Sequence, residues 1–413
     1  MRNRNFALLW IGQATSAVGS AVTSVALPLV AVSTLHAGPA PVALLTAATW
    51  VPWLLIGLPA GVWVDRWPRR RTLLIADLAS AAVLVAVPIA AWTGILTMPL
   101  LLAAALLAGV AGVFTSVAFN AFLPHLVGPE HLMESNARLQ TTASIALVAG
   151  PGLGGLLAQA AGPVSGVLLD AGTFLVSAAC LLALRAGPEP RSGHRATFKI
   201  ADGIRFIMRG RLLKTMLVVA AVTNFAMLGL TALRVIFLVR AEGVAPGTAG
   251  LAIGAGSLGA IAGAAVAAQA ARRFGSARTY LVASLAAAPF VLLLPLGGPG
   301  WRLAPFVAGS VVALGGATMA NVMTMTFRGT FVPGHLLGRV TAASRIFVFG
   351  TVPLGAATAG LLASAIGVRT AMWVLAALYV AAPLPLLATE ARTDRDFPAS
   401  PGVHGAVQEA VDG

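Results

Sequence analysis

A short polar stretch has the sequence Gly61-Val62-Trp63-Val64-Asp65-Arg66-Trp67-Pro68-Arg69-Arg70-Arg71-Thr72 and separates two long apolar runs. The runs, residues 41–62 and 73–92, are each long enough to cross a bilayer as a helix, which takes about 20 apolar residues. Because the connection is short, the two helices are antiparallel neighbours. Pro68 ends the helix before it, and Gly61 permits close approach of another helix. Basic residues collect on the cytoplasmic side of a membrane, so we expect this stretch to face the cytoplasm.

The composition excludes an ordinary soluble globule. Of the 413 residues, 58% are hydrophobic and 10% are charged, and the mean hydropathy is +0.90. Soluble domains carry about 25% charged residues. The 45 glycines suit helices that pack closely in lipid, where small side chains let backbones approach each other. We therefore expect an all-α polytopic membrane protein.

The net charge of +14 does not indicate a nucleic-acid partner, because the positions of the charges explain it. Of the 27 Lys and Arg residues, Arg234 and Arg345 fall inside predicted spans. Of the other 25, our assignment places 22 in the N-terminus, the even-numbered gaps and the C-terminal tail, and leaves Arg240, Arg302 and Arg369 near odd-numbered gaps. This asymmetry follows the positive-inside rule and predicts that both termini are cytoplasmic.

Twelve apolar segments are long enough to span the membrane, six on each side of a polar linker. The first half, residues 1–185, contains spans from the N-terminus to about Val32 and at about 41–63, 72–94, 98–123, 137–160 and 164–185. The second half, residues 212–389, contains spans at about 212–239, 249–271, 278–296, 302–327, 340–364 and 369–388.

The two remaining segments are polar. Residues 186–211 form the linker, and within it residues 198–209 place apolar side chains three and four apart among charges. This spacing predicts an amphipathic helix on the inner membrane surface. Residues 390–413 are polar and contain Pro398 and Pro401, which predicts a disordered cytoplasmic tail.

An internal repeat relates the halves. Pro129-Glu130-His131-Leu132-Met133 recurs as Pro333-Gly334-His335-Leu336-Leu337, and Gly155-Leu-Leu-Ala-Gln-Ala-Ala-Gly162 recurs as Gly360-Leu-Leu-Ala-Ser-Ala-Ile-Gly367. When Arg71 is set against Arg278, Asp65 lies opposite Arg272, so the second-half loop stays basic and loses the acid. The repeat predicts two pseudo-symmetric six-helix halves.

The pattern Gly61-x-x-x-Asp65-Arg66-x-x-Arg69-Arg70 between the second and third spans resembles the signature loop of the major facilitator superfamily of transporters. The resemblance implies that Asp65 interacts with the positive end of a helix in the opposite half, and that Arg66, Arg69 and Arg70 help to hold a cytoplasmic gate shut. The alternative is that these charges only set topology. An acid adds nothing to a positive-inside signal, which favours the gate.

The fifth span contains Gly150-Pro151-Gly152-Leu153-Gly154-Gly155, which resembles the glycine-proline motif of exporters in this superfamily. Pro151 removes a backbone hydrogen bond, so this helix can kink or hinge. The alternative is simple close packing. Together with Asn5-Phe6-Ala7-Leu8-Leu9-Trp10 and Asp202-Gly203-Ile204-Arg205-Phe206, the motif resembles the branch that contains macrolide-efflux and enterobactin-exporter proteins. That branch often has Gly-Asp where this chain has Gly19-Ser20, so one carboxylate that could carry a proton is missing.

Four ionisable residues fall inside predicted spans, where a charge costs about 2.5–3.5 kcal/mol on insertion scales. Asp77 and Asp170 are candidates for proton coupling, with structural hydrogen bonding as the alternative. Asp77 and Arg345 are expected about five residues inside the cytoplasmic ends of their helices, near enough to the surface to be structural. Arg234 could bind an anionic group or meet Asp170, or its side chain could snorkel to the outer surface.

Neutral polar residues are spread over the first, fourth, seventh and tenth spans, which line the central cavity according to the family resemblance. Each could instead make a helix-to-helix hydrogen bond, at about 0.6 kcal/mol. With Arg234, the substrate-cavity candidates are Gln13, Ser20, Thr23, Asn120, Asn224, Asn321 and Thr324.

No enzyme chemistry is indicated. The six His residues show no metal-ligand spacing, the single Cys180 lies in an apolar run, and the chain has no phosphate-binding Gly-x-x-x-x-Gly-Lys pattern. We therefore expect no metal, no cofactor and no ATPase activity.

These features predict a secondary-active exporter of lipophilic or amphiphilic small molecules, such as drugs or natural products. We expect it to work by alternating access and proton antiport, as a monomer in the bacterial inner membrane, with the substrate, protons and lipid as partners. The alternatives are an importer or exchanger of a siderophore, sugar or lysolipid, and a membrane receptor or scaffold without coupling. The Asp65 gate argues against a scaffold.

Overall fold

The computed structural model describes residues 4–184, 200–389 and 394–398. In these ranges, twelve helices are long and apolar enough to cross a membrane, which confirms the predicted all-α fold with two six-helix halves. The first half contains α1 (Arg4–Leu29), α2 (Pro39–Arg66), α3 (Arg69–Trp92), α4 (Met98–Val127), α5 (Leu132–Ala161) and α6 (Ser165–Ala183). The second contains α8 (Arg211–Val235), α9 (Pro246–Phe274), α10 (Ser276–Ala287), α11 (Leu303–Phe331), α12 (Gly334–Ile366) and α13 (Val368–Ala381).

Several spans are completed by tighter or wider turns. Irregular ends of this kind satisfy backbone groups that a regular helix leaves unpaired. The π-helical turns Val30–Thr34 and Ile236–Ala241 extend α1 and α8, and the 3₁₀ segments Ala288–Leu296 and Leu384–Ala388 extend α10 and α13. Shorter 3₁₀ turns, Pro129–His131 and Gly300–Arg302, precede α5 and α11.

The π-helical turns after α1 and α8 show how closely the halves repeat each other. The amide of Ala37 donates to the carbonyl of Ala31 (2.9 Å), and the amide of Val244 donates to that of Leu238 (2.8 Å). The residue before each donor, His36 in the first half and Gly243 in the second, has a positive φ (49° and 66°). Glycine adopts this conformation without steric cost, whereas His36 carries a side chain in it.

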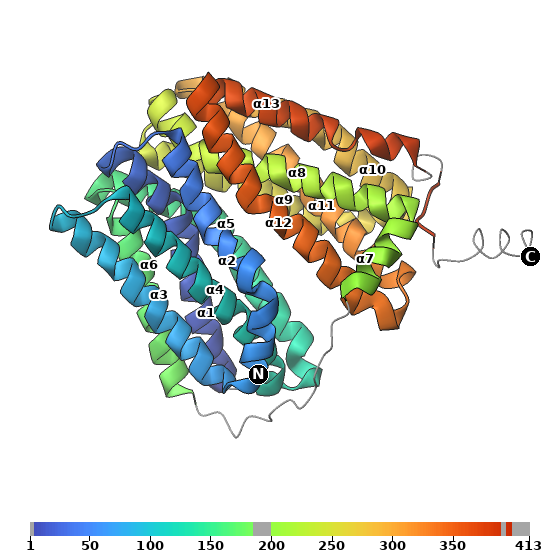
Figure 1. The fold of residues 1–413 in the computed structure, drawn as a ribbon, viewed down its shortest axis with the longest axis horizontal. Coiled ribbons are helices and arrows are strands. Elements are labelled where there is room, and N and C mark those ends of the chain that lie inside the picture. The colour runs from blue at the N-terminus through green and yellow to red at the C-terminus, as the bar shows by residue number, and fades with distance from the viewer. Residues whose placement is uncertain (1–3, 185–199, 390–393, 399–413) are drawn as a thin grey trace, which may run out of the picture.

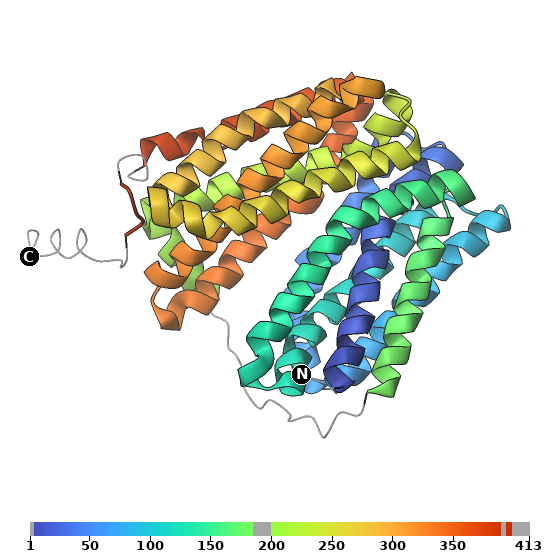
Figure 2. The same ribbon diagram turned by 180° about the vertical axis from the view of Figure 1, so that it is seen from behind.

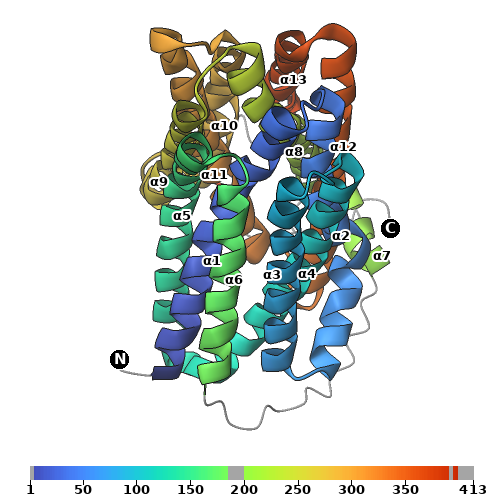
Figure 3. The same ribbon diagram turned by 90° about the vertical axis from the view of Figure 1, so that its left-hand side faces the viewer.

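The two halves lie side by side and diverge along their length (Figures 1 and 2). We call the end with the α1–α2 connection the His36 end, and the end with the α2–α3 connection the Asp65 end. The halves meet at the His36 end and separate toward the Asp65 end. Figure 3, seen from the side of the first half, shows α1, α3 and α6 running between these two ends.

The buried core has the same division. At the His36 end, one apolar cluster includes residues of both halves, among them Val30 and Leu45 with Phe237 and Leu375. Toward the Asp65 end, each half has an apolar cluster of its own. The cluster of the first half includes Phe122, and that of the second half includes Phe327. The halves are therefore held together chiefly at the His36 end.

Two of the glycine contacts between the halves come from the repeated sequence. A Cβ on Gly155 of α5 would overlap the backbone of Pro246 and lie 3.1 Å from the Cα of Gly250 in α9. A Cβ on Gly360 of α12 would lie 2.9 Å from the Cα of Ala40 in α2. The repeat therefore supplies two equivalent places where helices of opposite halves pack closely.

The predicted amphipathic helix is α7 (Ile200–Arg209), and it packs against α8 and α12. Ile207 is buried there, and Asp202 makes an ion pair with Arg339 (2.9 Å). Gly203 allows this approach, because a Cβ would overlap the backbone of Arg339. Residues 198 and 199 lie outside the described chain.

Part of the predicted disordered tail is also docked. The backbone amide of Ser276, at the start of α10, donates to the carboxylate of Asp396 (2.8 Å). The centroid of the Phe397 ring lies 4.6 Å from the ring centroid of Phe327 and 5.8 Å from that of Tyr280. The tail therefore supplies an N-terminal cap for α10, although residues 390–393 and 399–413 lie outside the described chain.

Candidate functional site

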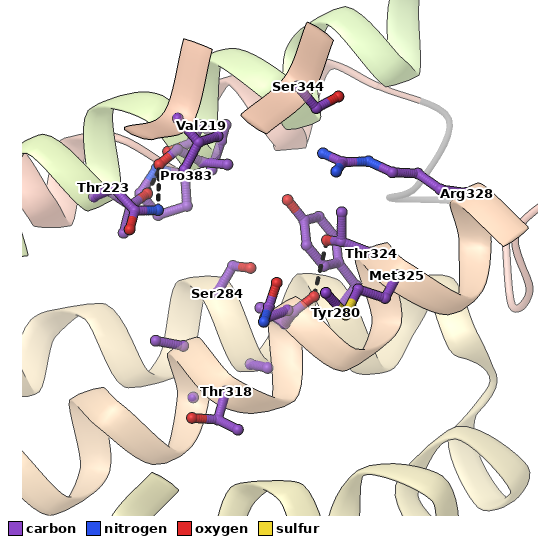
Figure 4. A pocket seen from close by; sticks show the side chains of 18 of the residues that line it. Val219, Thr223, Tyr280, Ser284, Thr318, Thr324, Met325, Arg328, Ser344 and Pro383 are labelled. Atoms are coloured by element: carbon purple, nitrogen blue, oxygen red, sulfur yellow. Dashed lines mark hydrogen bonds between the residues drawn. The ribbon is translucent and has the colours of Figure 1, made fainter. Parts of the chain in front are cut away.

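A cavity of about 660 Å³ lies in the second half, between α8, α10, α11, α12 and α13 (Figure 4). This volume is within the range of about 300–1,000 Å³ that is usual for small-molecule sites. Its wall mixes hydroxyl, amide and guanidinium groups with apolar side chains such as Met325, Val348 and Phe349. The cavity can therefore hold a molecule that is partly polar and partly apolar.

Three of the predicted cavity residues line this space. They are Asn224 on α8 and Asn321 and Thr324 on α11. The amide of Asn224 donates to the carbonyl of Ala220 (2.9 Å) and the hydroxyl of Thr324 to that of Ala320 (2.9 Å), so both side chains present acceptor oxygens to the cavity.

The predicted cavity residues of the first half lie elsewhere. Gln13, Ser20 and Thr23 are on α1 and Asn120 is on α4, and none of them lines the cavity of the second half. Ser20 and Asn120 are exposed, whereas the hydroxyl of Thr23 is buried beside Asp170 of α6.

Two arginines line the cavity, and the sequence pattern misplaces both. Arg345 lies eleven residues after the start of α12 at Gly334, roughly 16 Å along the helix at 1.5 Å per residue, and not five residues inside. Arg328 falls just outside the tenth predicted span, which ends at residue 327, and so counts as a loop charge in that assignment. Instead α11 continues to Phe331, and Arg328 lines the cavity.

Sequence analysis also missed Tyr280, Ser284 and Ser344, which the fold brings to the same cavity. The hydroxyl end of Tyr280, the side chain of Ser344 and the guanidinium of Arg328 face one another (Figure 4). One sequence signal for Arg328 was available. Asn321, Thr324 and Arg328 are spaced three and four residues apart, which places them on one face of a helix.

Arg234 does not line the cavity and does not snorkel. Its side chain is 6% exposed, and one terminal nitrogen donates to the sulfur of Met227 (3.5 Å) while Nε has no hydrogen-bond partner among the described residues. The structure pairs it with neither Asp170 nor another described acid. Arg234 is therefore a buried cation whose neighbours are mostly apolar.

Asp170 is buried on α6 in the first half, against α1. It accepts a hydrogen bond from the hydroxyl of Thr173 (3.1 Å), and it lies beside the hydroxyl of Thr23. Gly19 makes room for it, because a Cβ on that residue would overlap both Asp170 and Thr173. The glycine of the Gly19-Ser20 pair is thus needed for packing against a carboxylate on another helix.

Asp77 is fully buried on α3 and reaches the same face of α6. The hydroxyl of Ser177 donates to its Oδ2 (2.6 Å), while its Oδ1 has no partner among the described residues. Asp77 lies eight residues after the start of α3 at Arg69, roughly 12 Å along the helix, which is deeper than expected. Asp170, Thr173 and Ser177 follow at three and four residues, so one polar stripe of α6 connects the two carboxylates.

The predicted gate loop makes its contacts within the first half. Arg70 donates to the carbonyls of Leu181 (2.8 Å) and Leu182 (3.0 Å) at the end of α6, and Arg69 donates to that of Ala121 in α4 (3.2 Å). Asp65 and Arg66 are exposed. The space beside Gly61 is open, so the close helix approach that this glycine permits is absent in this conformation.

The glycine-proline motif lies between three helices. Gly150 and Gly154 face α1, where a Cβ on Gly154 would lie 2.7 Å from the carbonyl oxygen of Val22, whereas Gly155 faces α9. The carbonyl of Pro151 faces Gly250 of α9. α5 remains one helix through Pro151, so in this conformation the motif acts in close packing.

Comparison with known proteins gives a consistent result. The family model described as "Transmembrane secretion effector" matches residues 1–404. The multidrug efflux pump Tap of Mycobacterium tuberculosis is 28% identical over 409 residues, which cover 94% of this chain and 93% of the relative. The enterobactin exporter EntS of Shigella boydii is 28% identical over 323 residues, which cover 73% of this chain and 74% of the relative.

Solved structures agree on the fold. The nucleoside transporter NupG matches with a TM-score of 0.74 at 13% identity, and the match covers 94% of this chain and 99% of the NupG chain. A bacterial homologue of the iron transporter ferroportin in an inward-facing state has a TM-score of 0.75 at 16% identity, covering 94% and 99%.

Proposed function

Because the chain belongs to the transmembrane secretion effector family of major facilitator transporters, we propose that it exports lipophilic or amphiphilic small molecules across the bacterial cytoplasmic membrane. It acts as a monomer with both termini in the cytoplasm, so that the Asp65 end, which carries Arg66 and Arg69–Arg71, faces inward. On this orientation the structure is the inward-open state.

The observation that carries this proposal is the combination of one shared core and one cavity. The halves are joined at the His36 end, and the cavity lies in the part of the second half that faces away from this junction. A substrate can then enter from the cytoplasm or the inner leaflet while the outer side is closed. Rocking the halves about the glycine contacts gives alternating access.

The register of α2 against α12 indicates how the inner side closes. These helices are antiparallel, with Ala40 beside Gly360 and Leu54 beside Gly350. If the same register continued along α2, Asp65 would meet the first two turns of α12, which begins at Gly334. A carboxylate near a helix N-terminus is stabilised by roughly 0.3–1 kcal/mol. This contact is the gate that the loop motif predicts, and Gly61 is the small residue that permits it.

Energy coupling is assigned to the first half. Asp77 and Asp170 are buried, lack a described cationic partner and contact hydroxyls of one face of α6. A charged carboxylate is costly at such depth, so proton uptake and release at these sites change the relative stability of the two conformations. Proton entry would thereby drive substrate exit.

The test is drug tolerance in an efflux-deficient bacterial host that expresses the chain, against a panel of macrolides, dyes and other lipophilic compounds. Export raises tolerance, and Asp65→Asn removes most of this gain because it weakens the closed inner gate. The matched control is Glu134→Gln, since Glu134 is an acid at the same end of the same half in an exposed ion pair with Arg138 (2.7 Å).

Membrane levels of each variant are measured by immunoblot. No change in tolerance to any compound, with the protein present in the membrane, would contradict export of this substrate class. Full activity of Asp65→Asn would contradict the gate.

A further inference from the structure

Arg328 on α11 and Arg345 on α12 enter the cavity of the second half from two different helices. Neither guanidinium makes a hydrogen bond or ion pair with another residue in the part of the chain that the structure describes. Arg328 is half-buried in the last turn of α11, whereas Arg345 is exposed and lies eleven residues into α12. A charge that far inside a span is costly without a counter-charge, so Arg345 indicates function.

The second half has no carboxylate to offer these arginines from its own spans. Residues 211–241, 246–296 and 300–388 contain no Asp or Glu. Two acids outside these spans are engaged elsewhere: Asp202 pairs with Arg339 (2.9 Å), and Asp396 accepts from the amide of Ser276 (2.8 Å). The positive charge of the cavity is therefore uncompensated by the described protein.

The charged groups of the cavity come from α11 and α12. On α8, the hydroxyl of Thr223 and the amide of Asn224 donate to carbonyls of their own helix, so α8 presents neutral acceptors. Arg328 lies with its guanidinium toward Ser344 and Tyr280 (Figure 4). These three side chains mark a positively charged end of the cavity.

We infer that this end of the cavity binds the anionic group of an amphiphilic ligand, a carboxylate or phosphate, through Arg328 and Arg345. The planar guanidinium matches both anions with paired hydrogen bonds. The apolar part of the ligand lies against Met325, Val348 and Phe349. This inference rests on the proposed function, and it narrows the substrate class from lipophilic compounds in general to amphiphilic acids.

The first experiment measures binding and does not depend on transport. The full chain is placed in phosphatidylcholine nanodiscs and titrated with dansyl-labelled undecanoic acid and with its methyl ester, which lacks the negative charge. The acid binds at least about tenfold more tightly than the ester, about 1.4 kcal/mol.

Charge-removal variants locate the effect. In Arg328→Gln/Arg345→Gln the preference for the acid disappears while ester binding is unchanged. The double Lys variant retains part of the preference, because the charge remains without the planar fork. Arg272→Gln is the matched control, since Arg272 is an exposed arginine near the Asp65 end that does not line the cavity, and it retains the full preference. Equal binding of acid and ester by the unmodified protein, or an unchanged preference in the double Gln variant, would overturn the inference.

Anionic substrates and anionic phospholipids share the chemistry that this site recognises. Nanodiscs that contain phosphatidylglycerol distinguish them: competition with the dansyl acid identifies a lipid headgroup as an occupant, and undiminished binding identifies a free amphiphilic acid. Tolerance assays on the double Gln variant separate this inference from the proposed function. Selective loss of tolerance to acidic compounds supports the arginine site, whereas loss of no compound contradicts it even if export itself is established.

Discussion

In the first half, the charged groups buried inside the spans are the carboxylates of Asp77 and Asp170. In the second half, the guanidinium of Arg234 is buried, and the half-buried Arg328 and the exposed Arg345 line the cavity. The helical framework around these opposite charges is repeated. We infer that the first half handles protons and the second half handles the substrate, on a scaffold that both share.

Small residues on α1 and α8 show how the scaffold accommodates this difference. On α1, Gly19 packs against Asp170 of α6, because a Cβ on the glycine would overlap that side chain. On α8, the register of the two π-helical turns puts the buried Ala226 opposite Gly19. A small residue is therefore kept at this position in both halves, and it is a glycine in the half that contains the carboxylate.

The largest effect is expected for Asp77→Asn and Asp170→Asn. Asn keeps the shape and an acceptor for Ser177 or Thr173 but cannot take up a proton. We expect proton-coupled export to fall by about tenfold or more in each variant, the equivalent of about 1.4 kcal/mol. The measurement is substrate-induced proton movement in inverted membrane vesicles.

For this prediction, Glu134→Gln is the control, because it also removes an acid from the first half but leaves the buried carboxylates intact. If both Asn variants and their combination kept uphill transport, the division between a proton half and a substrate half would be wrong.

An intermediate effect is expected where the halves are alike. Gly155→Val and Gly360→Val each insert a branched side chain into a contact between opposite halves. Overpacking of this kind costs about 1–3 kcal/mol. We expect both variants to lower the thermal unfolding midpoint of the purified protein by similar amounts and to reduce export.

Gly172→Ala serves as the control, because the space beside Gly172 is open. A large loss of stability from Gly155→Val with none from Gly360→Val would show that the two junctions are not equivalent.

The smallest effect is expected at the loops that the repeat places opposite each other. The first-half loop carries its own acid, Asp65, whereas the second-half loop has Arg272 at that position and receives Asp396 from the tail. Asp396→Asn removes a charged cap worth at most about 1 kcal/mol. Export should change by less than about twofold, but the amides of Ser276 to Arg278 should exchange hydrogen faster.

Hydrogen exchange at Thr72, near the start of α3, provides an internal reference for this variant. Faster exchange there as well would mean that the effect is not confined to the tail contact, and unchanged exchange at Ser276 would contradict the cap.

Much of the architecture could be predicted from local sequence. The number of spans, the two halves and the family resemblance depend on hydrophobic length, charge and motif spacing, which are properties of neighbouring residues. Of the site, Asn224, Asn321 and Thr324 could be placed on cavity helices and do line the cavity. Arg328 could not be assigned, because a helix end near a basic residue cannot be located to within a turn from hydropathy.

The sequence by itself determined that this chain is a twelve-span membrane protein of two related halves, because each span must satisfy its own backbone hydrogen bonds in lipid. The tertiary structure alone decided which polar groups meet. Asp77 joins Ser177 across 100 positions of sequence, Asp396 reaches the amide of Ser276 across 120, and α7 packs against α12. These contacts depend on which helix faces pack together, and that is set by small residues such as Gly19 and Gly203 whose partners lie far away in the chain.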